Sequence, residues 1–172
     1  MGGGEDMTSF FKVYNAFFEK MEADENFFNY FDLSENQVMA LARDRAHTYL
    51  KEAVSILVRK VGTDDSDFSF SDYDDELEEF NVDLTDDEVD MLACLMYEQE
   101  YKRQFSKLKM LAFQHVPSSL QVFSPSNERK TIQALYERIH EDNVTMIDNY
   151  MSKDRLTHKR KSLDYSEFSS DD

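Results

Sequence analysis

The sequence predicts a mainly α-helical protein, a small helical bundle with one long acidic loop, short strands or a β-hairpin, and extended ends. Several long stretches repeat apolar residues at three- and four-residue steps, as amphipathic helices do. Two of these stretches begin with a capping box, Ser34 with Gln37 and Thr85 with Glu88. The chain has 172 residues, of which 41% are hydrophobic, enough for one domain with its own core.

Residues 1–33 are predicted to form an N-terminal aromatic helix and an arm. Thr8 or Ser9 is suited to cap this helix, and its apolar face consists of Phe10, Phe11, Tyr14, Phe17, Phe18 and Met21. Such an aromatic stripe is typical of a core or of an oligomer contact. The first seven residues hold glycines and acids where a signal peptide has basic and then apolar residues, so we expect no secretion.

Residues 34–151 are predicted to form the core of the bundle, with the acidic loop at 62–84. Gly62 is expected to end the helix that Ser34 begins. From Gly62 to Asp90 the chain holds fourteen Asp or Glu and no Lys or Arg. The segment Phe68–Ser71 alternates like a short strand, and so does Leu120–Ser124.

Two further helices follow the acidic loop, one from Thr85 to about Gln114 and one from Ser126 to about Tyr150. The polar middle of the first, residues 98–104, is expected to face solvent or to break the helix, with Glu98 and Lys102 paired four residues apart. The spacing of their apolar residues predicts an antiparallel pair. Its expected buried seam comprises Leu92, Met96, Ile132, Leu135, Ile139 and Met146.

Residues 152–172 are predicted to be a charged C-terminal tail. Five bases lie just after the last helix of an otherwise acidic chain: Lys153, Arg155, Lys159, Arg160 and Lys161. We expect them to form an interface by reaching acidic residues of a neighbouring chain. The overall charge of −17 argues against a duplex-binding protein, because binding DNA requires Lys and Arg at the phosphates.

The sequence contains no constellation typical of catalysis, so we expect no enzymatic activity and no cofactor. His47, near Arg43 and Lys51, is interpreted as a surface imidazole. A partial match to a calcium-binding EF-hand loop comprises Asp65, Asp67, Ser69 and Glu76. Phe70 occupies the position where the sharp turn needs glycine, and the following residues are acidic rather than amphipathic. We therefore expect no metal site.

Two segments carry a resemblance to a known family. One is Phe80–Met96, with its acidic Asp83-Leu-Thr-Asp-Asp-Glu helix start, and the other is Phe123-Ser-Pro-Ser-Asn followed by a helix ending near Tyr150. Residues 80–150 resemble neck proteins from tailed phages of Gram-positive bacteria. The resemblance implies a head–tail connector, a dodecameric ring that joins the portal protein to the next neck or tail protein and continues the DNA channel. It implies a virion protein, assembled in the host cytoplasm, without a membrane partner.

The acidic loop acquires two expected roles from this resemblance. Its aromatic residues Phe68, Phe70 and Tyr73 are candidate anchors for a neighbouring chain. Its acids Asp72, Asp74, Asp75 and Glu76 are candidates for facing the channel, where negative charge repels DNA without binding it. Alternatively, the loop lies outside the ring and keeps it soluble or docks on the neighbour. Two other classes stay open, another acidic adaptor or scaffolding protein and a soluble inhibitor that mimics DNA charge.

Overall fold

The computed structural model describes residues 7–22, 25–28, 32–62, 68–113 and 125–161, and it confirms a mainly helical fold. Its helices are α1 (Phe10–Met21), α2 (Glu25–Phe28), α3 (Glu35–Val61), α4 (Asp86–Phe113) and α5 (Pro125–Met151). Its strands are β1 (Thr8–Ser9), β2 (Tyr73–Asp74) and β3 (Glu79–Phe80).

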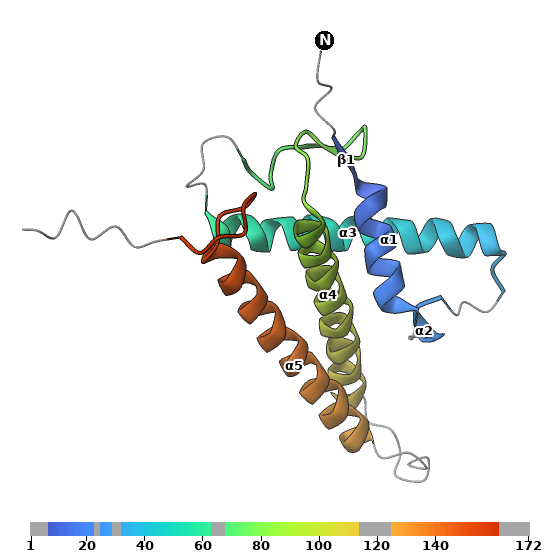
Figure 1. The fold of residues 1–172 in the computed structure, drawn as a ribbon. Helices are drawn as coiled ribbons and strands as arrows, with labels where there is room; N and C mark the ends of the chain where they lie inside the picture. The colour runs from blue at the N-terminus through green and yellow to red at the C-terminus, as the bar shows by residue number, and fades with distance from the viewer. Residues whose placement is uncertain (1–6, 23–24, 29–31, 63–67, 114–124, 162–172) are drawn as a thin grey trace, which may run out of the picture.

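Helix α4 is the centre of the fold, because α1, α3 and α5 all pack against it. The start of α4 lies beside the sheet, and α3 packs against α4 near its middle, where Tyr49 meets Glu100 and Arg103. Helices α4 and α5 extend together as an antiparallel pair (Figure 1). The molecule is therefore branched. A body of α1, α3 and the sheet lies at one end, and the joined ends of α4 and α5 lie at the other.

The sheet is antiparallel, with β3 between β1 and β2, and it closes the core at the start of α1. Phe10 lies at this junction, with its ring 5.0 Å from that of Phe80 and 5.7 Å from that of Tyr73. Phe17, farther along α1, packs edge-to-face on Phe27 of α2. Aromatic burial of this kind supplies much of the hydrophobic stabilisation of a small domain.

The helix ends follow the predicted capping chemistry. Ser9 is the N-cap of α1 and accepts a hydrogen bond from the Phe11 amide. At α3, the Ser34 amide donates to Gln37 Oε1 over 2.9 Å. Gly62 ends α3 with φ of +73°, a conformation that glycine adopts without strain.

The second half of the bundle differs from the sequence prediction in two ways. Helix α4 does not break at residues 98–104, because it continues without interruption to Phe113. Nor does this polar stretch lie wholly in solvent, since Glu98 and Glu100 are buried. The predicted α4–α5 seam is buried only on α4, at Leu92 and Met96. On α5, Ile132, Ile139 and Met146 are half-buried, and Leu135 is 37% exposed. In the described part of the chain α5 packs mainly on α4 and only slightly on α3, so one side of α5 stays in solvent.

Three smaller expectations are corrected or fall outside the described residues. Helix α5 begins at Pro125, one residue before the predicted cap. Phe68–Ser71 ends in a turn rather than forming a strand, and the hairpin strands lie at Tyr73–Asp74 and Glu79–Phe80. The strand expected at Leu120–Ser124 and the expected extended ends at 1–6 and 162–172 lie outside the described residues.

Candidate functional site

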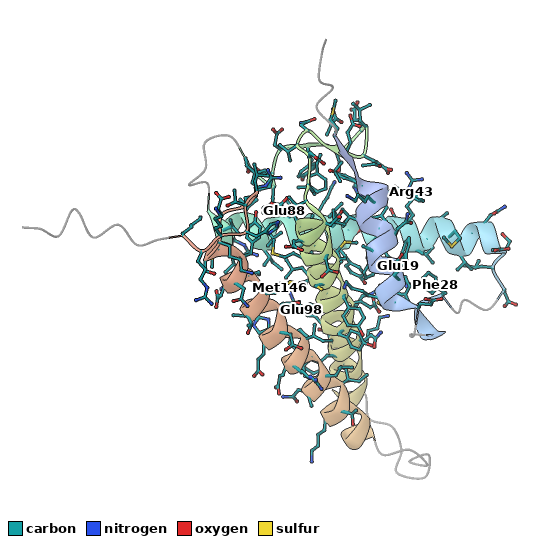
Figure 2. All side chains as sticks on the ribbon, in the orientation of Figure 1. Glu19, Phe28, Arg43, Glu88, Glu98 and Met146 are labelled. Carbon is teal, nitrogen blue, oxygen red and sulfur yellow. The ribbon has the colours of Figure 1, made fainter. Side chains whose placement is uncertain are left out.

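Three carboxylates of α4 are buried: Glu88, Glu98 and Glu100, each 5% exposed or less. Burying a carboxylate is costly unless hydrogen bonds or a cation replace its water. Glu88 and Glu98 lie along the helix between the sheet and the far end of the bundle (Figure 2). The hydrogen-bond partners of each carboxylate show which other elements it connects to α4.

Glu88 binds the start of the C-terminal segment to the start of α4. Arg155 donates from Nε to one carboxylate oxygen over 2.6 Å and from Nη2 to the other over 2.9 Å. The Tyr150 hydroxyl adds a 2.6 Å bond, and the Thr85 amide a 2.8 Å bond. The Arg155 guanidinium also stacks on the Phe68 ring at 3.7 Å. This cluster ties α5, the loop before the hairpin and α4 together.

Glu98 connects α4 to α5. His140 Nδ1 lies 2.7 Å from Oε1, and Asn143 donates to Oε2 over 2.8 Å and to the Cys94 carbonyl over 3.2 Å. Glu98 is thus paired across the helices rather than with Lys102, as the sequence pattern had indicated. Asn143 within an apolar stripe was the signal that a buried polar partner lay opposite.

Glu100 connects α4 to α3. The Tyr49 hydroxyl donates to Oε2 over 2.5 Å, Arg103 donates to the same hydroxyl over 3.0 Å, and Gln104 donates to Oε1 over 3.2 Å. Burial, and then the bond to the anionic Glu100, raises the pKa of Tyr49 to about 12. The hydroxyl therefore stays protonated and acts as a hydrogen-bond donor.

A fourth cluster joins the hairpin to α1 and α3. The Tyr14 hydroxyl lies 2.9 Å from His47 Nδ1, and His47 Nε2 lies 3.2 Å from Asp75 Oδ1. Lys51 donates to the other oxygen of Asp75 over 2.7 Å. The order Tyr–His–Asp resembles a catalytic relay, but Tyr14 is 1% exposed and burial raises its pKa well above the ordinary range. His47 is thus a half-buried link, not the surface imidazole that the sequence indicated.

The four acids proposed to face a channel lie in or beside the hairpin, and three have local partners. Asp72 accepts a hydrogen bond from Asn81, and Asp75 joins Lys51 and His47. Asp74 accepts from the amides of Glu76 and Leu77 and so shapes the turn. Glu76 is exposed at that turn. A channel-facing role stays a prediction for these residues.

The aromatic interface candidates pack against the chain's own core. Phe70 is 3% exposed, so its ring has no free surface for a neighbour, which corrects the sequence expectation. Phe68 and Tyr73 are half-buried, Phe68 beneath Arg155 and Tyr73 beside Phe10. Nothing in the spacing of these residues distinguishes an anchor for another chain from a residue that closes its own core.

Among the five basic interface candidates, the structure distinguishes Arg155 from the other four. Arg155 binds Glu88 of its own chain, because residues 152–161 fold back as a turn closed by a bridge between Lys153 and Arg160. The amide of Lys161 donates to the Ser152 carbonyl over 2.9 Å, which completes this turn. The Lys153, Lys159, Arg160 and Lys161 side chains are exposed, and their contact with a neighbouring chain stays a prediction.

The EF-hand-like match is not assembled in the described part of the chain. Asp65 and Asp67 lie outside it, while the Ser69 hydroxyl is 2.7 Å from that of Ser71. Among the described residues, no three His, Cys, Asp or Glu side chains converge as a metal site would require. No helix within those same residues is long and apolar enough to cross a bilayer.

Comparison with known proteins adds no identification. No family model, curated protein or solved structure matches this chain.

Proposed function

We propose that this chain is a non-enzymatic structural subunit that assembles with copies of itself, as a head–tail connector ring of a tailed phage. The observation that carries the proposal is the exposure of large apolar side chains on a molecule whose buried polar groups are paired internally. Among the described residues eight are exposed: Met7, Phe11, Leu33, Met39, Leu77, Met110, Leu135 and Leu156. They lie at the sheet and the start of α1, at the start of α3, on the α4–α5 pair and on the C-terminal turn, and apolar surface left in solvent is available for protein–protein contacts.

The clusters of α4 support a scaffolding role over a catalytic one. Each carboxylate accepts hydrogen bonds from side chains of another helix or of the C-terminal turn, and these bonds hold the bundle together. The specific form of a connector rests on the resemblance of residues 80–150 to phage neck proteins. The partners that follow are the portal, the next neck or tail protein, and DNA that passes without tight binding.

Imaging tests the proposal directly. The full-length chain is imaged by negative stain alone, and then mixed with a portal protein. A connector adds a ring to one end of the portal particle. A chain that leaves portal particles unchanged, and stays a monomer or dimer at every concentration, contradicts the connector and favours the soluble inhibitor that mimics DNA charge.

A further inference from the structure

The charge of this chain is unevenly divided between the two ends of the molecule. Residues 101–136 carry six Lys or Arg and one acid, a net charge of +5, whereas the rest of the chain carries −22. Of these, residues 101–113 form the last part of α4 and residues 125–136 the first part of α5, at the free end of the helix pair (Figure 1). We call this end the basic tip and define it by exposed Lys107, Lys109 and Lys130, together with exposed Met110 and Leu135.

Like charges crowd at the tip. Burial and then the nearby Arg103 guanidinium lower the pKa of Lys107, with Glu100 opposing them and Arg45 adding to them. Burial and Arg103 likewise lower the pKa of Arg45. A cluster of exposed bases of this kind is suited to a negatively charged partner.

The hairpin at the opposite end of the molecule is negatively charged and so complements the basic tip. Asp74 of β2 lies directly across from Glu79 of β3, and like charges at such a pair are destabilising. Glu76 and Leu77 are exposed at the turn between the strands, with Leu77 67% exposed. The Phe10 amide bonds to the Glu78 carbonyl, which places exposed Phe11 beside this turn. We call Asp74, Glu76, Glu79, Leu77 and Phe11 the acidic seat.

The two ends cannot neutralise each other within one molecule. Lys107 and Lys109 lie 21 and 23 residues after Asp86, the first residue of α4, so at 1.5 Å per residue the helix separates the two ends by roughly 30–35 Å. Screening limits the attraction between exposed charges to roughly 8–10 Å at physiological salt. Only a second molecule can bring a tip and a seat together.

We propose that the basic tip of one copy docks on the acidic seat of the next, in a head-to-tail contact. The apolar side chains of both ends form the centre of the contact, and the opposite charges surround it. Two different surfaces meet, so the contact closes into a ring when the rotation between copies allows it. The inference rests on the proposed self-assembly and names the surfaces that would carry it. It assigns the hairpin acids to the neighbouring subunit rather than to a DNA channel.

Two charge-reversed variants of the full chain test the contact. The tip variant is Lys109→Glu with Lys130→Glu, and the seat variant is Glu76→Lys with Glu79→Lys. The matched control, Arg59→Glu with Lys60→Glu, makes the same change as the tip variant at two exposed bases of α3. Circular dichroism first verifies that each variant is folded, and mass photometry then measures association against concentration and salt.

Each variant alone should need at least roughly tenfold more protein to associate than the wild type, whereas the control should match the wild type. Mixing the two variants in equal amounts should restore association, because each reversed tip then meets a reversed seat. A mixture that stays dissociated, or variants that assemble as well as the wild type, overturns the head-to-tail contact while leaving self-assembly standing. Variants that assemble normally but change retention of DNA assign the acids to a channel or the tip to nucleic acid instead. A wild-type chain that never associates overturns both the contact and the proposed function.

Discussion

Removing the Arg155 side chain tests whether the C-terminal turn holds the bundle together. Arg155→Met leaves the carboxylate of Glu88, which is 0% exposed, without its cation. Breaking a buried ion pair on one side costs about 3–5 kcal/mol. Glu88 keeps its bonds to Tyr150 and Thr85, and the Arg155 side chain is 20% exposed, so we expect the lower end, about 3 kcal/mol. For a chain of this size that lowers the melting temperature by about 6–12 °C.

The measurement is thermal and urea unfolding followed by circular dichroism, with two controls. Lys153→Ala removes an exposed base two residues away and should change the free energy of unfolding by no more than about 0.5 kcal/mol. Adding Glu88→Gln to Arg155→Met removes the unpaired charge and should recover part of the loss. The reasoning is refuted if Arg155→Met melts at the same temperature as Lys153→Ala.

Three further predictions follow from the same structure. The folded pKa of Tyr49, about 12, lies above its ordinary value of 10. The protonated Tyr49 hydroxyl therefore contributes its full stabilisation of the fold below pH 10, and this stabilisation is lost as the pH rises through 12. Unfolding at alkaline pH, followed together with tyrosinate absorbance, should show this loss of stability. Tyr49→Phe should flatten the pH dependence of stability. Ile147→Ala should lower the free energy of unfolding in urea by about 2–4 kcal/mol, because the Ile147 side chain is 3% exposed. Leu135→Ala should lower it by less than about 1 kcal/mol, because Leu135 is 37% exposed. Equal losses would contradict this packing. Truncation before Ser152 should destabilise the fold about as much as Arg155→Met, and an unchanged melting curve would show that the turn is dispensable.

The helices and their ends were predictable because capping is local. Ser34 with Gln37 and Thr85 with Glu88 lie three residues apart, so a single sequence displays both members of each box. The same holds for the aromatic face of α1, whose residues recur with the helical period.

The buried carboxylates were not predictable, because their partners are far away in the chain. Tyr49 is 51 residues from Glu100, and Arg155 is 67 residues from Glu88. Read locally, Glu98 and Glu100 belong to a polar stretch that indicates solvent. Their burial follows from the position of α4 between α3 and α5, which no local pattern specifies. Leu135 shows the converse, because its spacing matches a core position while its side chain is 37% exposed.

The mass of the purified full-length chain is the most direct test of its role as an assembly subunit. Native mass spectrometry or mass photometry, recorded from low to high protein concentration at physiological salt, measures it. We expect one closed oligomer whose mass is a fixed multiple of 20.3 kDa and whose population falls as salt is raised. A monomer or dimer at every concentration, alone and in the presence of the portal, would contradict the account.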